Sequence, residues 1–270
     1  MGRASNLIIL PMTKNRKGSF SNMTDLKEVS ELGFDPESWK RLFNWKWYKH
    51  QMSGWSKSQY TLLAFGLIFL LVTGFSGGVS LLGTTATIAG LIGFTTVVST
   101  TAGKPISGVG GFISAVMFIF IATQTGNYSD IIMQLFYIIL LDIPLVFLSS
   151  WKKEELSPRL LKGKYIIQTV FMFIGFWMAT YGLDVILNSP RPIIDSLAAT
   201  IGLVGAVLTV RKFRATYYFW FAQGVMSVIL WGVTAMQGHA VWVLFFTYVL
   251  YILNDVVAFL DSKWFPKKKE

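Results

Sequence analysis

The chain has 270 residues, of which 53% are hydrophobic and only 14% are charged, and its formal net charge is +10. Charged residues make up roughly 25% of an ordinary soluble domain, so this composition indicates an integral membrane protein. The chain contains no cysteine, which excludes disulfide bonds and thiol catalysis.

Residues 1–59 precede the first long apolar segment, and we expect them to form a cytoplasmic N-terminal region. The apolar run at residues 7–12 is too short for the core of a secretory signal peptide. Asp35 and Pro36 form a helix start signal before a segment rich in Trp, Phe and Lys, which predicts an amphipathic helix over about residues 36–49. Such a helix suits either the membrane surface or a packing site on cytoplasmic loops.

Eight apolar segments follow, each close to the roughly 20 residues that a helix needs to cross a bilayer. We expect membrane-spanning helices at residues 60–79, 81–100, 105–125, 130–150, 165–187, 194–210, 217–237 and 241–260. If all eight segments cross, every Lys and Arg residue except Arg191 lies on one side of the membrane. The positive-inside rule then places both termini in the cytoplasm, including a basic tail at residues 265–270. The net charge is therefore explained without a nucleic-acid partner.

The second half of the predicted membrane domain repeats the first at a spacing of 113 residues. At this spacing Asp142 matches Asp255, and Ser114 matches Ser227. Contact with lipid does not select such polar residues, so their recurrence indicates a duplication. The predicted organisation is an all-α membrane protein with an extra helix at 60–79, a first three-helix copy at 81–151, a linking helix at 165–187 and a second copy at 194–264.

The linking helix gives both predicted copies the same orientation in the membrane. An odd number of spans in each copy would otherwise invert the second one. Two parallel copies are related by a pseudo-twofold axis along the membrane normal, as in some transporters. A substrate is then expected near the middle of the membrane, between the two three-helix bundles.

Polar residues inside these spans are the candidate binding residues, because a buried polar group is costly unless it has a partner or faces a cavity. Gln134, Ile138 and Asp142 are spaced to share one face of a helix. In the second copy, aromatic residues recur at helical spacing beside Gln223, a mixture that suits a flat polar heterocycle. The predicted substrate-binding residues are Gln134, Trp220, Asn254, Tyr217, Gln223, Ser227, Ser114, Asp142, Asp255 and Tyr251.

The paired aspartates have two interpretations that the sequence leaves open. Asp142 and Asp255 either contact the substrate or form hydrogen bonds that hold the helices together. Gln134 and Asn254 are the stronger candidates for substrate contact.

Other kinds of chemistry find little support. The glycine-rich stretch at residues 107–112 has no following Lys-Ser or Lys-Thr, so it predicts a kink or a close helix approach instead of a phosphate loop. His50 and His239 lie outside the spans, and no spacing indicates a metal site, a cofactor or a catalytic group. An integral membrane enzyme would need a catalytic constellation, and a membrane scaffold has little reason to repeat buried polar residues. Transport is the favoured function.

Several short motifs resemble the PnuC family of bacterial vitamin transporters. They are TIAGLIG at 87–93, GNYSDIIMQLFYI at 126–138, the basic RKF loop at 211–213, the Trp-containing helix at 217–231 and ILND at 252–255. The resemblance covers about residues 81–264. It implies two parallel three-helix bundles joined by one helix, similar to a full-length sugar-transporter fold of the SWEET type.

The resemblance implies a multi-pass protein of the bacterial cytoplasmic membrane that takes up nicotinamide riboside by facilitated diffusion. A cytoplasmic kinase would then retain the vitamin by phosphorylating it. Whether the protein forms a homo-oligomer stays open. The family glutamine falls on Gln134 and the family asparagine on Asn254. The family pattern Trp-x-x-Trp-x-x-x-Asn/Asp falls on Tyr217, Trp220 and Gly224, so two of its three positions differ here. Thiamine and riboflavin therefore stay as alternative substrates.

Overall fold

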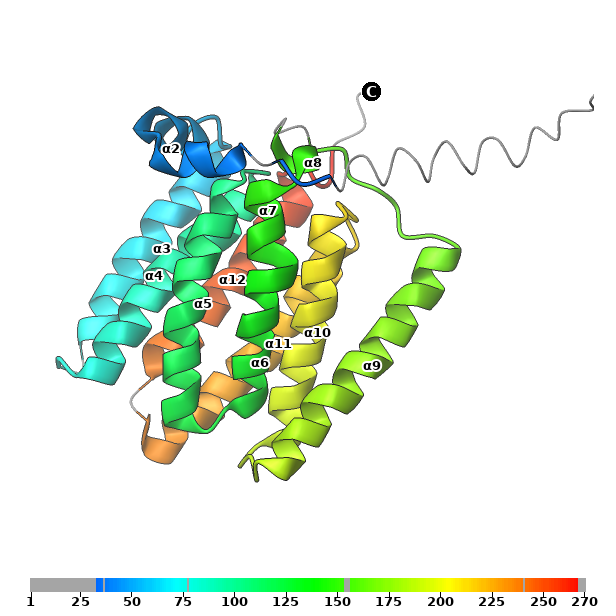
Figure 1. Ribbon diagram of the computed structural model, residues 1–270. Helices are drawn as coiled ribbons and strands as arrows, with labels where there is room; N and C mark the ends of the chain where they lie inside the picture. Colours follow the sequence, from blue (N-terminus) through cyan, green and yellow to red (C-terminus); the bar gives the residue numbers. More distant parts are fainter. Residues whose placement is uncertain (1–32, 36, 77, 153–155, 240, 267–270) are drawn as a thin grey trace, which may run out of the picture.

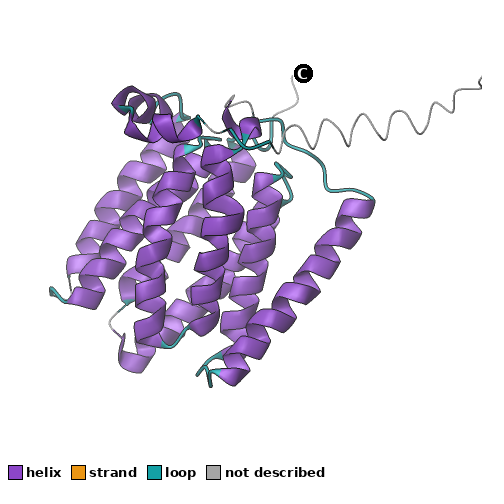
Figure 2. Ribbon diagram, in the orientation of Figure 1, coloured by secondary structure: helices purple, strands orange, loops and turns teal. Residues whose placement is uncertain are grey.

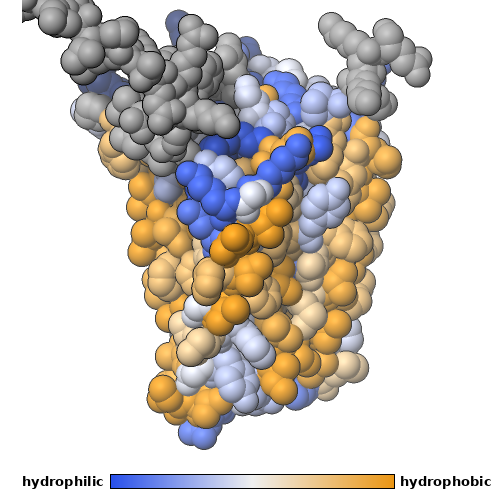
Figure 3. Space-filling model, turned by 90° about the vertical axis from the view of Figure 1, so that its right-hand side faces the viewer, coloured by the Kyte–Doolittle hydropathy of each residue, from blue (hydrophilic) through white to orange (hydrophobic). Residues whose placement is uncertain are grey.

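The computed structural model describes residues 33–35, 37–76, 78–152, 156–239 and 241–266. Within these ranges the chain is almost entirely helical, and eight helices are long and apolar enough to cross a membrane. Figures 1 and 2 show them as one bundle, with α2, α8 and the C-terminal end of α12 at the same end of it. Figure 3 shows a hydrophobic band across the face that carries α9, with hydrophilic residues at both ends. The prediction of eight spans is confirmed.

The spans are close to their predicted positions. They are α3 (Lys57–Phe75), α4 (Leu81–Thr101), α5 (Ile106–Thr125), the segment α6–η2–α7 (Tyr128–Tyr137, Ile138–Asp142 and Ile143–Phe147), α9 (Lys164–Ile186), α10 (Pro192–Val210), α11 (Thr216–Thr234), which continues into η3 (Ala235–His239), and α12 (Trp242–Leu260). A short helix, α8 (Ser149–Lys152), follows α7.

The segment before α3 differs from the single amphipathic helix that the sequence predicted. It forms a 3-10 helix, η1 (Ser38–Phe43), and a separate helix, α2 (Trp45–Gln51). The break lies at Asn44, whose side chain accepts a hydrogen bond from the Lys46 backbone N–H at 3.0 Å and so caps α2. The Gln51 side chain joins this segment to the bundle, because its Oε1 accepts the Ile106 N–H at 3.3 Å.

The helices of the two predicted copies pack across each other. Within the copies, α5 packs on α4 and α6, and α11 packs on α10 and α12. Between the copies, α4 packs on α12, and α10 packs on α6. Each copy therefore places its first helix against the third helix of the other. Two helices lie outside this arrangement: α3 packs on α4 and α12, and α9 packs on α10 (Figure 1).

A π-helical turn interrupts the third span of the first copy. Pro144 has no N–H, and a proline ring clashes with the carbonyl four residues earlier in a regular α-helix. The chain widens at η2, where the Ile143 N–H bonds to the Ile138 carbonyl, five residues back. Such π-turns often occur at functional sites. In the second copy Val257 takes the place of the proline, and α12 is an uninterrupted α-helix.

The glycines of α5 let this helix approach the π-turn closely. A Cβ atom at Gly108 would overlap the backbone carbonyl of Asp142, and one at Gly111 would overlap the Asp142 carboxyl group. The glycine-rich stretch is therefore a close helix approach, one of the two structures that the sequence predicted. It brings the Asp142 side chain against α5 at the centre of the molecule.

Candidate functional site

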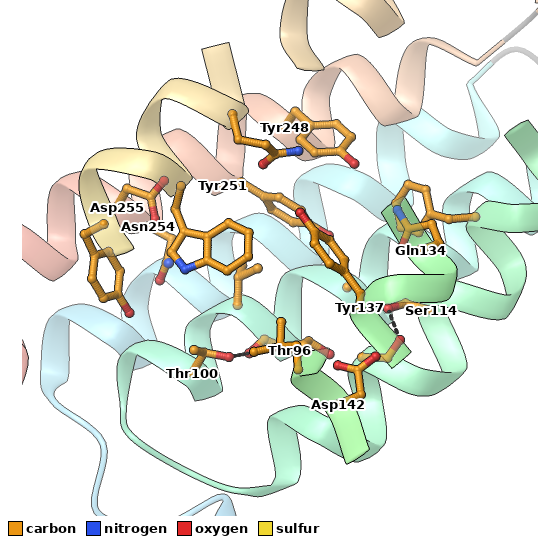
Figure 4. Close-up of a pocket in the computed structure, with 18 residues that line it drawn as sticks. Thr96, Thr100, Ser114, Gln134, Tyr137, Asp142, Tyr248, Tyr251, Asn254 and Asp255 are labelled. Carbon is orange, nitrogen blue, oxygen red and sulfur yellow. Dashed lines mark hydrogen bonds between the residues drawn. The ribbon is translucent and has the colours of Figure 1, made fainter. Parts of the chain in front are cut away.

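A cavity lies between the two copies, lined by five of the spans. α4, α5 and the α6–η2 segment form one wall, and α11 and α12 form the other. The cavity has a volume of about 100 Å³, which is small beside the roughly 300–1,000 Å³ of typical ligand pockets. Figure 4 shows Asp142 and Ser114 on one side of the cavity and Asn254 and Asp255 on another.

Nine of the ten predicted site residues line this cavity together. The exception is Ser227, which lies behind Gln223 and accepts a hydrogen bond from the Gln223 Nε2 at 2.8 Å. The nine residues are Gln134, Trp220, Asn254, Tyr217, Gln223, Ser114, Asp142, Asp255 and Tyr251.

Sequence reasoning missed half of the lining. Ile138, expected on the same face as Gln134 and Asp142, does not line the cavity, while Tyr137 does. The missed residues are Gly93, Thr96, Val97, Thr100, Gly111, Phe118, Tyr137, Leu141 and Tyr248. Tyr248 precedes Tyr251 by one helical turn, so its spacing was a usable signal. Tyr137 follows Gln134 in α6 by the same spacing, so the same signal was present there.

Thr101 joins three helices behind the cavity. Its hydroxyl lies 2.9 Å from the Asn254 Nδ2, and it accepts the Tyr217 hydroxyl at 3.0 Å. The same hydroxyl lies 3.1 Å from the Val97 carbonyl, to which it can donate. Because the two partner side chains are fully buried, this network fixes the orientation of Asn254 and Tyr217 before any ligand binds.

Trp220 is oriented by a second network, which involves α10. Its indole Nε1 donates to the Thr209 hydroxyl at 3.0 Å, and Thr209 lies 2.7 Å from the Thr216 hydroxyl. The ring also meets Tyr137 edge to face, with 5.8 Å between the ring centroids and 77° between the planes. The cavity therefore has an aromatic corner built by both copies.

Two polar atoms in the lining have no hydrogen-bond partner. They are the Tyr137 hydroxyl and Oδ2 of Asp142, and both are buried. Buried side-chain polar atoms are paired in the large majority of cases, so an unpaired atom in a cavity wall is available to a ligand or to water. Figure 4 shows Tyr137 between Tyr251 and the side chains of Ser114 and Asp142.

The lining contains acidic side chains but no basic ones. Asp142 and Asp255 bring two carboxyl groups to the cavity, and no Lys, Arg or His is among its lining residues. Across the described part of the chain, no group of three or more His, Cys, Asp or Glu residues has a geometry that could hold a metal ion. The arrangement can bind a flat polar molecule that is neutral or positively charged.

Comparisons with known proteins agree with this geometry. A family model described as "Nicotinamide mononucleotide transporter" matches residues 83–265, which is more than half of the chain. No curated protein matches the chain. A solved structure described as "Crystal structure of the Vitamin B3 transporter PnuC" superposes with a TM-score of 0.69 at 19% sequence identity. The match covers 80% of this chain and 95% of that one, and at this identity it shows a shared fold.

Proposed function

The chain belongs to the nicotinamide mononucleotide transporter family, and from this membership we propose that it takes up nicotinamide riboside by facilitated diffusion. The family is a transporter family, so the protein is a membrane transporter and not an enzyme. The proposal concerns the form of the vitamin, the route through the central cavity and the way in which the vitamin is retained.

The charge of the cavity carries this proposal. The family description names a mononucleotide, which has a phosphate group, whereas the riboside has none and keeps the positively charged pyridinium ring. Proteins bind phosphate with Arg, Lys and backbone N–H groups. The cavity offers two carboxyl groups and no basic side chain. A phosphate buried there would have no opposite charge, which costs several kcal/mol, while a pyridinium would face carboxyl groups.

The aromatic corner suits the nicotinamide ring. A pyridinium over the face of Trp220 or Tyr137 would gain a cation–π interaction of up to about 2 kcal/mol in a site without water. Both rings are held in place, Trp220 by its bond to Thr209 and Tyr137 by its edge-to-face contact. Gln134 and Ser114 lie in the same cavity for the ribose hydroxyls, and the unpaired Asp142 oxygen is available to the pyridinium.

Retention follows from the same charge preference. Facilitated diffusion lets the riboside move in both directions, so it cannot by itself accumulate the vitamin. Phosphorylation by a cytoplasmic kinase adds negative charge, and the product would then be disfavoured by a cavity with carboxyl groups and no cation. Trapping would need no ion coupling in the transporter.

Thiamine is the stronger of the two alternative substrates. Its thiazolium ring is a cation and satisfies the same charge argument. Riboflavin is larger and uncharged, and the small cavity volume does not favour it. Competition between these compounds distinguishes the three ligands directly.

The test is binding and uptake with purified protein. Nicotinamide riboside should raise the melting temperature and enter proteoliposomes, while nicotinamide mononucleotide, thiamine and riboflavin should have much weaker effects. Trp220→Ala and Gln134→Ala should each reduce riboside uptake by about tenfold or more, equivalent to at least about 1.4 kcal/mol of lost binding. Ile139→Ala, at an exposed position on the same span as Gln134, is the control and should leave uptake unchanged. Tighter binding of the mononucleotide than of the riboside would refute the proposed substrate.

A further inference from the structure

Arg191 lies at the end of the bundle opposite to α2, which we call the far end. The far end holds the α5–α6, α9–α10 and α11–α12 connections, whereas α2, α8 and the basic loops lie at the other end, the basic end (Figure 1). Arg191 stands in the α9–α10 connection, directly before α10, and its residue is only 6% exposed. A buried arginine needs partners for its charge.

These partners come from both copies. The Arg191 guanidinium donates to the Asn127 Oδ1 from Nε at 3.0 Å and from Nη2 at 2.6 Å, and Nη2 also lies 2.7 Å from the Thr125 carbonyl. Both partners belong to the α5–α6 turn of the first copy. On the opposite side, Nη1 donates to the Gln237 side chain in η3 of the second copy. One side chain thus joins three connections at the far end.

The partners of Arg191 are all uncharged. The ion pairs of the described residues do not include Arg191, whose hydrogen bonds go to amide and carbonyl oxygens. Burial lowers the pKa of Arg191, and the charge of Asp195 acts in the opposite direction. Neutral acceptors can be replaced by water with less loss than a carboxylate partner, because the attraction of an ion pair is not lost when they separate.

The far half of the bundle separates Arg191 from the cavity. The cavity residues lie in the middle of the spans and toward the basic end, for example Thr96 and Thr100 near the end of α4. Toward the far end, Ile121, Trp231 and Leu244 are completely buried and fill the space between the copies. A ligand that approaches from the far side would have to part this layer and the connections that Arg191 joins.

We propose that Arg191 is a latch that holds the far end of the transporter closed and is released when the cavity opens to that side. This inference rests on the proposed transport function, since it assigns the closed end of the transport path. Because the basic loops mark the cytoplasmic side, the latch closes the external side. Without the latch, the layer around Leu244 becomes open to water more often.

The absence of native cysteine makes a direct test available. Leu244→Cys supplies one thiol in the buried layer, and its reaction with a membrane-impermeant thiol reagent is followed in intact cells. Adding Arg191→Leu should raise the labelling rate about tenfold or more, since several hydrogen bonds to a charged group are lost. Arg191→Lys should give a smaller increase, because lysine keeps the charge but not the planar set of donors.

The matched control is Arg214→Leu, the same substitution at the basic end, which should leave the labelling rate unchanged. If Arg191→Leu does not reach the membrane, Gln237→Ala removes only one acceptor and should still raise the rate. An unchanged rate in correctly folded Arg191→Leu protein, or an equal rise in Arg214→Leu, would overturn the latch. Labelling uses no substrate, so its outcome is independent of whether nicotinamide riboside is the ligand.

Discussion

The two copies place matching residues in different surroundings. Ser114 of the first copy lines the cavity, whereas Ser227 lies behind it and accepts a hydrogen bond from Gln223. Thr96 lines the cavity, whereas its match, Thr209, accepts the indole N–H of Trp220. The first copy thus presents small polar groups to the cavity. The second copy uses the same residue types to orient larger side chains.

The matching aspartates differ in their backbone. Asp142 ends the π-turn before Pro144 and has an unpaired carboxyl oxygen, whereas Asp255 belongs to a regular α-helix. Both carboxyl groups still line the cavity. The two predicted copies thereby present unequal walls to the cavity, which is what an asymmetric ligand requires. The predictions below test this inequality by making the same change in both copies.

The largest difference is expected at the matched glycines Gly111 and Gly224. In Gly111→Ala the new Cβ would overlap the Asp142 carboxyl group, with 2.7 Å to its Cγ, so this cavity group must move. In Gly224→Ala the overlap is with the Ile252 side chain, at 2.8 Å from its Cγ1. Overpacking costs about 1–3 kcal/mol at either site, and melting temperatures of both variants would measure this cost.

Uptake distinguishes the two glycine variants. Gly111→Ala should lower riboside uptake per folded molecule by about tenfold or more, because it displaces a carboxyl group of the cavity wall. Gly224→Ala should change uptake less than about threefold, because Ile252 does not line the cavity. Equal losses of uptake in the two variants would contradict the proposed inequality of the walls.

The aspartate pair should show a smaller difference. Asp142→Asn keeps the shape of the side chain but removes the charge that an unpaired oxygen offers to a cation, so riboside affinity should fall about tenfold. Asp255→Asn should lower affinity only about threefold, because Asp255, unlike Asp142, has no buried oxygen without a hydrogen-bond partner. Calorimetric titration measures both values.

The reduced riboside separates charge from shape in this experiment. Its dihydropyridine ring has the same outline and no positive charge. Asp142→Asn should therefore weaken binding of the oxidised riboside more than binding of the reduced form. A parallel loss for both forms would mean that Asp142 supports helix packing only.

The serine pair should give the smallest effects, and their coupling is more informative than their size. Ser114→Ala and Ser227→Ala should each reduce uptake by about two- to fivefold, the loss of one neutral hydrogen bond. Combined with Gln223→Ala, Ser227→Ala should add little, because Ser227 acts through Gln223. Ser114→Ala should add its full effect to Gln223→Ala. Additivity in both double variants would contradict the positioning role of Ser227.

The sequence predicted the fold more completely than the site, for physical reasons. A membrane helix needs about 20 apolar residues and satisfies its own backbone hydrogen bonds, so hydropathy alone locates each span. Nine of the ten predicted site residues line one cavity because polar residues in spans face inward. The sequence did not point to the other half of the lining. Leu141 and Phe118, for example, are apolar residues that give no polar signal within a span.

The break at Asn44 shows the same limit on a smaller scale. Asp35 and Pro36 predicted the start of one helix, and the structure describes two short helices after Glu37, while Pro36 lies outside the described residues. Asparagine is a strong N-cap residue, so the second start was visible at Asn44. The sequence thus carried a start signal at Asp35 and another at Asn44. Only the structure shows that the chain breaks at Asn44 and begins a second helix there.

By itself the sequence determined a membrane protein of eight helices and the matching residues of its two halves, because composition and spacing are properties of the chain alone. Only the tertiary structure decided which member of each matching pair faces the cavity. That choice depends on contacts between distant helices, such as Gly111 against Asp142 and Thr209 against Trp220. It also depends on the π-turn at Ile138–Asp142, which has no counterpart in α12. Likewise, the sequence shows that Arg191 is the one Lys or Arg residue on its predicted side of the membrane. Only the structure shows that its side chain bonds to the other two connections at that end.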